Sequence, residues 1–375
     1  MNTAYFATCA RGLEPLLARE LTTLTAQQVE IGRGGVAFVG DRSLLYRSCL
    51  WLRTAIRVLQ PVLKAEILSA DELYDAVRSV DWAQWMTPEQ TLAVDCNLRD
   101  SALTHSQYAA RRVKDAICDQ FRERTGRRPR VDTEHPMIAL NLHVAHNHAI
   151  LSLDGAWVSL HKRGYRPIQT IAPLNEALAA GLLLHTGWNG STPLVDPLCG
   201  SGTLAIEGAW IAVNRAPGLT RKWFPFQAWP DFDRSMWNAL RDEARAAVAK
   251  QLSAPIVGSD IRADVIELAQ RNARAAGMGH LLQWSRCDVR AARPPCATPG
   301  LVICNPPYGE RIGEEKELAC LYQGIGEVAR SHWPGWRWAV FTSNHRLARL
   351  IDLPIVRKTP FFNGSLECML WEFQT

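Results

Sequence analysis

The chain has 375 residues, 47% of them hydrophobic and 21% charged, which is typical of a globular protein with room for two or three domains. No apolar run reaches the roughly 18 residues of a membrane span, and the first residues lack the basic start and apolar core of a signal peptide. We therefore expect a cytoplasmic protein. The formal net charge of +5 permits a nucleic-acid partner without requiring one.

Short strand-like and helical runs alternate through the first 165 residues, which predicts an α+β region. The strand candidates are AYFATCA, GGVAFVG, TLAVDCNL, IALNLHVA and HAILSLDGAWVSL, and the helical ones include GLEPLLARELTTL and DELYDAVRSVDW. In a further helical run, residues 106–124, the apolar Val113, Ile117 and Phe121 recur at helical spacing. This periodicity predicts a stripe that faces a core.

Basic residues outnumber acidic ones between Arg99 and Arg130, in a stretch that ends with RERTGRRPR. This excess predicts a local cationic surface, for which a plain solvated face and contact with an RNA backbone are alternative interpretations. The candidates for RNA contact are Arg111, Arg112, Lys114, Arg127 and Arg128, together with Arg311 in the C-terminal third.

The pattern changes after a polar connector, HKRGYRPIQTIAP, in which Pro173 can open the helix PLNEALAAGLLLHTGW at its first turn. From there strands and helices alternate, which predicts a parallel sheet with covering helices. The last run, IVRKTPFFNGSLECMLWEF, predicts a hairpin with a type I′ turn at Asn363 and Gly364. An antiparallel pair that closes a parallel sheet is unlike a dinucleotide-binding dehydrogenase.

An aromatic segment, RAPGLTRKWFPFQAWPDFDRSMW, separates the first and second strands of this sheet. It is longer than a simple crossover. We interpret Trp223, Phe224, Phe226 and Trp229 as core residues rather than as platforms for base stacking.

The ten cysteines are scattered, without a C-x-x-C pair, and several lie in apolar strands, as Cys304 does. We interpret them as buried free thiols and expect no metal. The histidines of HVAHNH, His143, His146 and His148, are better explained by the end of a strand and its turn than by metal binding.

The run DPLCGSG joins the first strand of the sheet to a helix that starts near Thr203. Its glycines let the backbone approach a ligand, and no Lys-Ser/Thr pair follows Gly202, which argues against a P-loop. Asp196, Asp260 and Asp288 end three successive strands, so their carboxylates meet at the edge where open α/β sheets bind ligands. They suit a cationic group, a ribose diol and an adenine amine respectively, which describes S-adenosylmethionine.

The fourth strand ends in LVICNPPYGERIG, where Asn305 precedes two prolines that stop the strand. DPLCGSGT, Asp260, Asp288 and NPPY resemble the cofactor and catalytic motifs of amino-methylating Rossmann-like methyltransferases, and the terminal hairpin is similar to their antiparallel seventh strand. Members with NPPY act on adenine N6, guanine N2 or glutamine amides. The motif alone therefore does not identify the substrate.

Four further runs narrow the resemblance to bacterial large-subunit (23S) ribosomal RNA guanine-N2 methyltransferases with an N-terminal THUMP module. These runs are SQYAARRVKDAICDQFRERTGRRPRVD, LDGAWVSLHKRGYR, NPPYGERIG and FFNGSLEC. The resemblance implies a ferredoxin-like segment at 1–50, a THUMP RNA-binding domain at 51–165 and a class I methyltransferase domain at 166–375, with a seven-stranded sheet whose last strand is antiparallel. Many members carry a second methyltransferase domain, so only the N2-methylating half is implied.

The resemblance also implies roles for residues. The oxygen of Asn305 and the carbonyl of Pro306 would accept the two N–H bonds of the guanine amine, and Tyr308 would stack on the flipped base. The implied cofactor residues are Asp196, Cys199, Gly200, Gly202, Thr203, Asp260, Asp288 and Asn305. The implied partner is RNA, with no membrane and no metal.

Three alternatives stay open. The same chemistry could act on transfer RNA, because related THUMP-bearing enzymes do so. Adenine-N6 methylation of DNA is disfavoured by the N-terminal half. The chain could also be an inactive RNA-binding protein of ribosome assembly, although intact DPLCGSGT and NPPY speak against decay.

Overall fold

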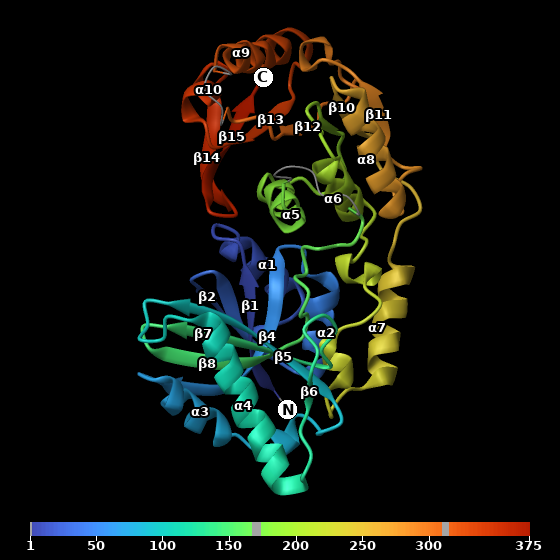
Figure 1. Cartoon of the computed structure of the whole chain (residues 1–375). Helices are drawn as coiled ribbons and strands as arrows, with labels where there is room; N and C mark the ends of the chain where they lie inside the picture. The colour runs from blue at the N-terminus through green and yellow to red at the C-terminus, as the bar shows by residue number, and fades with distance from the viewer. Residues whose placement is uncertain (1, 167–173, 310–314) are drawn as a thin grey trace. The chain divides into compact units, whose positions relative to one another are not determined.

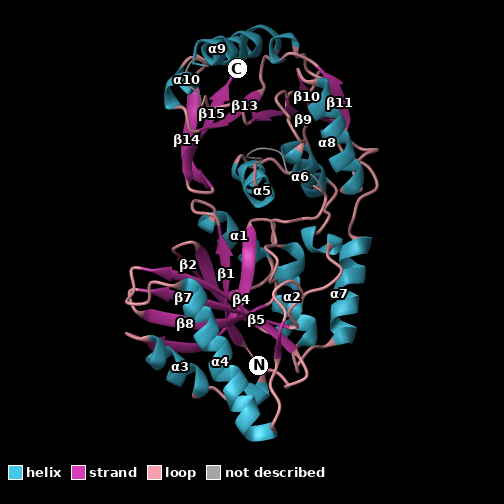
Figure 2. Ribbon diagram, viewed as in Figure 1, coloured by secondary structure: helices cyan, strands magenta, loops and turns pink. Residues whose placement is uncertain are grey.

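The computed structural model describes residues 2–166, 174–309 and 315–375, which form two compact units. Each unit is assembled from three segments of the chain. The first unit comprises Met1–Thr8, Ala18–Leu160 and Arg221–Asp242, and the second comprises Cys9–Leu17, His161–Thr220 and Glu243–Thr375. Figure 1 follows the chain by colour, and Figure 2 marks its strands and helices.

The first unit contains an eight-stranded mixed sheet with the order β2-β3-β1-β4-β8-β7-β5-β6. The strands are β1 (Thr3–Cys9), β2 (Gln27–Gly32), β3 (Gly35–Gly40), β4 (Ala55–Glu66), β5 (Thr91–Arg99), β6 (Arg130–Val131), β7 (Ile138–Ala145) and β8 (His148–Asp154). The helices of this part of the chain are α1 (Glu14–Thr23), α2 (Arg42–Trp51), α3 (Ala70–Arg78), η1 (Trp82–Gln84) and α4 (Ser106–Thr125).

Helix α4 confirms the predicted apolar stripe. Val113, Ile117 and Phe121 are all buried, because their spacing places them on one face of the helix. The helix ends at Gly126, whose left-handed φ of 70° suits glycine. Its opposite face carries Arg111 into solvent.

The twelve-residue strand β4 was not predicted from the sequence pattern. Pro61 lies in its middle, and a proline normally argues against a strand inside a sheet because it cannot donate to the ladder. The structure accommodates Pro61 opposite Ser152, beside a register shift between Pro61 and Leu63. A local irregularity thus allows a proline in an inner strand.

The second unit contains a seven-stranded sheet with the order β11-β10-β9-β12-β13-β15-β14. Its strands are β9 (Leu194–Asp196), β10 (Ile256–Asp260), β11 (Gln283–Arg286), β12 (Leu301–Cys304), β13 (Arg337–Thr342), β14 (Ile355–Asn363) and β15 (Leu366–Gln374). The remaining helices of the chain are α5 (Glu176–His185), α6 (Thr203–Ala212), η2 (Pro217–Thr220), η3 (Pro225–Ala228), α7 (Arg234–Ala246), α8 (Ala263–Ala275), η4 (Val289–Ala291), α9 (Glu315–His332) and α10 (His345–Arg349). Of these, η3 and most of α7 belong to the first unit.

Five neighbouring strands of this sheet, β9 to β13, run parallel, and β15 is antiparallel to both of its neighbours. The predicted alternation and the closing hairpin are therefore confirmed. Helices α9 and α10 cover one face of the sheet, and α5 and α6 lie on the other (Figure 1). Asn175 caps α5 through bonds to the amides of Ala177 and Leu178, whereas Pro173 lies outside the described residues.

The hairpin turn differs from the prediction. β14 ends at Asn363 and β15 begins at Leu366, so the two loop residues are Gly364 and Ser365. Only Gly364 has a positive φ, of 64°, whereas a type I′ turn needs positive φ at both loop residues. A glycine at the first loop position is instead the signature of a type II′ turn.

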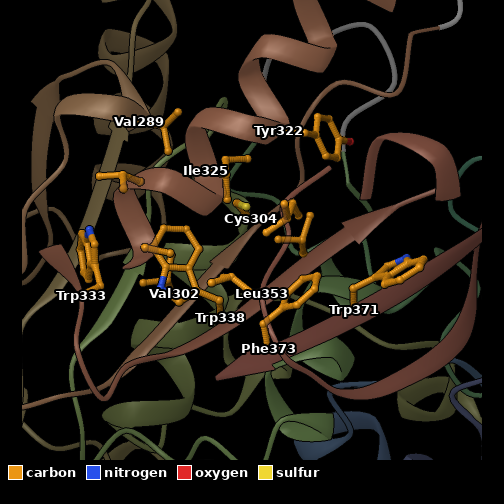
Figure 3. Packing of buried hydrophobic residues seen from close by; sticks show 14 of the residues in the cluster. Val289, Val302, Cys304, Tyr322, Ile325, Trp333, Trp338, Leu353, Trp371 and Phe373 are labelled. Atoms are coloured by element: carbon orange, nitrogen blue, oxygen red, sulfur yellow. The ribbon is translucent and has the colours of Figure 1, made fainter. Parts of the chain in front are cut away.

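A hydrophobic cluster lies beneath α9 and α10 and includes the buried face of the sheet (Figure 3). Val302 and Cys304 of β12 pack there with the indoles of Trp333 and Trp338 and with Tyr322. All four residues of β12 are buried, which explains its continuous apolar sequence. This packing fixes the position of the C-terminal end of β12, which Asn305 directly follows.

From Arg221 onward, the aromatic segment belongs to the first unit. Phe224, Phe226 and Trp229 are buried, and the ring of Phe226 stacks on that of Tyr46 with centroids 4.8 Å apart. The core interpretation is confirmed for these three and wrong for Trp223, which is exposed. Within the described ranges, the structure contains no helix long and apolar enough to cross a bilayer.

Candidate active site

The predicted acids meet at the carboxyl edge of the seven-stranded sheet. Asp196 ends β9, Asp260 ends the adjacent β10, and Asp288 comes two residues after β11. The amide of Gly200 donates to a carboxylate oxygen of Asp260 over 3.1 Å, so the glycine loop after β9 reaches the end of β10.

A cavity of about 580 Å³ opens at this edge. Four of the predicted cofactor residues line it: Gly200, Asp260, Asp288 and Asn305. Asp196, Cys199, Gly202 and Thr203 are not among the lining residues. The other residues of the lining are Leu198, Ile261, Arg262, Val265, Val289, Arg290, Pro307, Glu317, Cys320 and Leu321.

Asp196 lies behind the cavity, with only 2% of its surface exposed. One of its carboxylate oxygens accepts from the amide of Leu198 over 3.3 Å. Burial raises the pKa of Asp196 to about 8, and the nearby charge of Asp260 acts in the same direction. The carboxyl is therefore largely protonated at neutral pH, and a cationic ligand nearby would favour its ionised form.

The glycine loop rests on an indole. A Cβ at Gly202 would lie 2.6 Å from the ring of Trp284, and one at Gly258 would lie 2.4 Å from the same ring. Asn272 of α8 donates to the carbonyl of Ser201 over 2.9 Å. These contacts explain why glycines are found where the loop after β9 and the strand β10 pass close to Trp284.

Thr203, at the start of α6, is held by a residue that the motifs did not single out. Arg166 donates to the Thr203 hydroxyl over 3.4 Å and to the carbonyl of Leu174 over 3.1 Å. Its guanidinium also pairs with Glu176, at 2.5 Å. Arg166 thus links the first turn of α5 to the first turn of α6.

Asp288 is engaged by its own neighbour. The guanidinium of Arg290 contacts both of its carboxylate oxygens, with a closest distance of 2.5 Å. Hydrogen bonding to Arg290 lowers the pKa of Asp288 from its ordinary value. Asp288 is therefore an ionised acceptor at the cavity, and Arg290 is a lining residue that the sequence motifs did not indicate.

The cavity also has apolar surfaces that sequence reasoning missed. Ile261, Val289 and Leu321 line it, and Ile261 is 54% exposed despite its aliphatic side chain. Ile261 and Val289 each directly follow one of the predicted acids. This position next to an acid was the sequence signal from which they could have been predicted as lining residues. Apolar side chains beside carboxylates suit a ligand with a flat heterocycle and polar edges.

The NPPY loop continues from the end of β12. The hydroxyl of Tyr308 donates to the side-chain oxygen of Asn305. The carbonyl of Pro307 accepts from the hydroxyl of Tyr322 over 3.3 Å, whereas no donor to the carbonyl of Pro306 is found in the described part of the chain. Burial raises the pKa of Tyr308, so its hydroxyl stays protonated and remains a donor.

The predicted RNA-contact residues differ in their environments. Arg112 pairs with Asp71 over 2.7 Å, Arg127 pairs with Glu89 over 3.0 Å, and Lys114 pairs with its neighbour Asp115. Arg111 and Arg128 are exposed and have no ion pair with any described residue. Arg311 lies outside the described residues.

All ten cysteines are free, and six are buried as expected, whereas Cys96, Cys287 and Cys296 are half-buried and Cys320 is exposed. The histidines of HVAHNH lie on β7, in the following turn and on β8, as predicted. Within residues 2–166, 174–309 and 315–375, no group of three or more metal-binding side chains is found.

Comparisons with known proteins agree with this architecture. Residues 163–372 match the RMKL-like methyltransferase domain, residues 69–154 match the THUMP domain, and residues 4–59 match the RlmL ferredoxin-like domain. The fold class expected from the sequence is confirmed by these matches and by the seven-stranded sheet.

Three proteins illustrate the similarity. A putative RNA methyltransferase of Synechocystis is 45% identical over 99% of this chain and 96% of its own length. A ribosomal RNA large subunit methyltransferase K/L of Syntrophotalea carbinolica is 46% identical over 98% of this chain, which spans 53% of that relative. A putative methyltransferase solved as a complex with SAH has a TM-score of 0.91 and 29% identity, with 100% and 98% of the two chains covered.

The chain thus spans about half the length of a K/L-type relative and nearly all of the Synechocystis protein. The methyltransferase match alone covers more than half of the chain. This chain belongs to the RMKL-like methyltransferase family, with ferredoxin-like and THUMP domains preceding the methyltransferase domain.

Proposed function

We propose that this chain transfers the methyl group of S-adenosylmethionine to the exocyclic N2 amine of a guanine in large-subunit ribosomal RNA. One observation carries the proposal: Asn305, Asp260 and Asp288 line the same cavity at the carboxyl edge of the sheet. The names of the K/L-type relatives support ribosomal RNA as the substrate, and the SAH complex of the structural neighbour supports the donor.

The cavity fits such a donor by its own chemistry. Asp260 offers carboxylate oxygens to a ribose diol, and Asp288 offers them to an adenine amine beside the apolar Ile261 and Val289. The buried carboxyl of Asp196 needs a nearby cation to ionise at neutral pH. When bound, the sulfonium compound supplies an electrophilic methyl group.

The chain's own residues would act on the acceptor. A guanine amine is a weak nucleophile, because its lone pair is delocalised into the ring. The oxygen of Asn305 and the carbonyl of Pro306 accept its two N–H bonds and favour a more tetrahedral nitrogen. The same acceptors stabilise the positive charge that develops on the nitrogen.

The bonds formed and broken in this transfer balance, and no general base is required. The nitrogen lone pair forms the new N–C bond, the electron pair of the broken C–S bond remains on sulfur, and the methylated amine then releases one proton to water. The hydroxyl of Tyr308 orients Asn305 so that its amide oxygen, rather than its nitrogen, is held as the acceptor. The Tyr308 ring can stack on a base that has left its helix.

In the first unit, Arg111 and Arg128 are exposed cations that we assign to phosphate contacts, together with a weaker share from the paired Arg112, Lys114 and Arg127. A THUMP domain matches this part of the chain. We further assign residues 1–50, 51–165 and 166–375 to the ferredoxin-like, RNA-binding and catalytic parts.

The test is methyl transfer from isotopically labelled S-adenosylmethionine to total RNA and, separately, to genomic DNA, followed by fractionation and nucleoside analysis. We expect N2-methylguanosine in large-subunit RNA. Label in transfer RNA would favour that substrate instead, and N6-methyladenine in DNA would overturn the guanine assignment. RNA binding without any transfer would favour an inactive assembly protein, and an Asn305→Ala protein supplies the negative control.

A further inference from the structure

A second, widely open cavity, of about 460 Å³, also borders the NPPY loop. Its walls come from the loop after β12, from the loop that leads from β13 into α10, and from the start of β15. The lining residues are Tyr308, Gly309, Ser343, Asn344, His345, Arg346 and Leu366. Its volume falls within the usual range for small-ligand sites.

The NPPY loop borders both cavities. Asn305 and Pro307 line the first, whereas Tyr308 and Gly309 line the second. The hydrogen bond from Tyr308 to Asn305 therefore joins a wall of one cavity to a wall of the other. Two molecules that react at Asn305 can therefore occupy one cavity each.

The lining of the second cavity differs in charge from that of the first. The first is lined by both acids and arginines, whereas the described lining of the second contains Arg346 and no acid. His345 and Arg346 are exposed there, and Arg346 forms no ion pair with a described residue. A guanidinium without a protein partner is suited to a phosphate, to which it can donate two parallel bonds.

Asn344 links the start of α10 to the NPPY loop. Its amide nitrogen donates to the carbonyl of Tyr308 over 3.2 Å, and its amide oxygen accepts from the amide of Leu347 over 3.1 Å. Arg346 therefore lies two residues after a side chain that is bonded to Tyr308. Tyr308 and Leu366 are the large residues with apolar side-chain atoms in the lining of the same cavity.

We propose that the second cavity receives the acceptor nucleotide, with its base against Tyr308 and an adjacent phosphate bound by Arg346. This inference rests on the proposed function and adds to it a phosphate site within the catalytic unit. Arg346 is thus a substrate-positioning residue, since it holds the nucleotide that presents its amine to Asn305. It does not touch the methyl donor.

The experiment compares Arg346→Ala with Arg349→Ala in the full chain. Arg349 is a matched control, because it is an exposed arginine of the same helix that does not line the cavity. Calorimetry with SAH and thermal melting first establish that both variants are folded and bind the donor product normally. Arg346→Lys is the conservative variant, which keeps the charge without the planar guanidinium.

Two measurements then test the assignment. In methyl transfer to RNA, Arg346→Ala should lower kcat/KM by roughly 10-fold or more and reduce the salt dependence by about one charge, whereas Arg349→Ala should change kcat/KM less than about 3-fold. The kcat/KM of Arg346→Lys should lie between those of the wild type and Arg346→Ala. In NMR saturation transfer, guanosine 5′-monophosphate should bind the wild type and Arg349→Ala in the presence of SAH but should not bind Arg346→Ala.

The outcomes separate this inference from the proposed function. If the wild type methylates RNA but the two alanine variants lose kcat/KM equally and bind the nucleotide equally, the phosphate site is overturned while the function stands. If the wild type methylates no RNA but binds the nucleotide in an Arg346-dependent way, the function fails and the nucleotide site stands.

Discussion

The hydroxyl of Tyr308 donates to the side-chain oxygen of Asn305, so the two polar members of the NPPY loop are bonded to each other. An amide oxygen has two lone pairs, and this bond leaves one of them for a second donor. Tyr308 therefore has a polar function in addition to the stacking surface that its ring offers. Its hydroxyl presets the direction in which Asn305 accepts.

This relationship predicts a graded series of variants. Asn305→Ala should lower the single-turnover methylation rate by roughly 100-fold or more, comparable with the loss of one oxyanion-type group. Tyr308→Phe keeps the ring but removes the hydrogen bond to Asn305, so we expect the methylation rate to fall roughly 10-fold. Tyr308→Ala also removes the ring and should lower the rate further. Near-normal turnover by a folded Asn305→Ala protein would exclude the proposed mechanism.

The buried carboxyl of Asp196 predicts that donor binding depends on pH. With a pKa of about 8 before binding, the carboxyl of Asp196 must lose its proton to offset the charge of a cationic ligand bound nearby. Between pH 6 and 7.5 the affinity for S-adenosylmethionine should rise by up to about tenfold per pH unit, since one proton is released. Calorimetry in buffers of different ionisation enthalpy measures that proton, and Asp196→Asn should abolish its release.

The same carboxyl predicts an opposite trend in the stability of the ligand-free protein. The folded carboxyl keeps its proton up to about pH 8, whereas the unfolded one loses it near the ordinary value of 3.8. The folded state therefore binds more protons in this window, and the contribution of Asp196 to the free energy of unfolding falls as the pH rises from about 4 to 8. Denaturant titrations should show a flatter trend for Asp196→Asn, and an identical trend would argue against the raised pKa.

Arg166 predicts a positioning effect on the glycine loop. Arg166→Lys retains the charge but loses the fork that contacts Glu176, Leu174 and Thr203 together. We expect the KM for S-adenosylmethionine to rise several-fold while kcat stays within about 3-fold, and Glu176→Gln should have a smaller effect of the same kind. A fall in kcat without a change in KM would place Arg166 elsewhere in the reaction.

The basic face of the first unit predicts a difference between free and paired arginines. The double variant Arg111→Ala, Arg128→Ala should weaken RNA binding roughly 10-fold and reduce the salt dependence by about two charges. Arg127→Ala should cost less, because Glu89 already offsets part of its charge. Filter binding of RNA at several salt concentrations measures both effects, and equal losses would mean that ion pairing does not govern the contacts.

The sequence predicted the parts of the site that depend on strand ends. Asp260 and Asn305 follow apolar runs whose termini are legible in the chain, so their meeting at one edge needed only the rule for parallel strands. Arg166 and Trp284 could not be found in this way. Their importance arises from tertiary contacts with Thr203, Gly202 and other residues distant in the chain.

In the fold, too, elements with a local sequence signal were predicted, whereas elements that depend on a partner strand were not. The hairpin of β14 and β15 was predictable because its turn residues carry a local signal, although the turn type was set by Gly364 and Ser365. The strand β4 was missed because Pro61 argues locally against a strand, and only the bulge opposite β8 makes it acceptable. Local rules thus failed where a partner strand decided the outcome.

Each unit consists of separate segments of the chain, and this limits how the two units can be exchanged in evolution. The first unit includes Arg221–Asp242 from between β9 and β10, and the second includes Cys9–Leu17 from near the N-terminus. A single cut after residue 165 would strip Tyr46 of its stacking partner Phe226 and leave that ring without its core. Gene fusion or module exchange between relatives would therefore have to transfer several separate segments at once, so the two units are expected to evolve as a linked pair rather than as interchangeable cassettes.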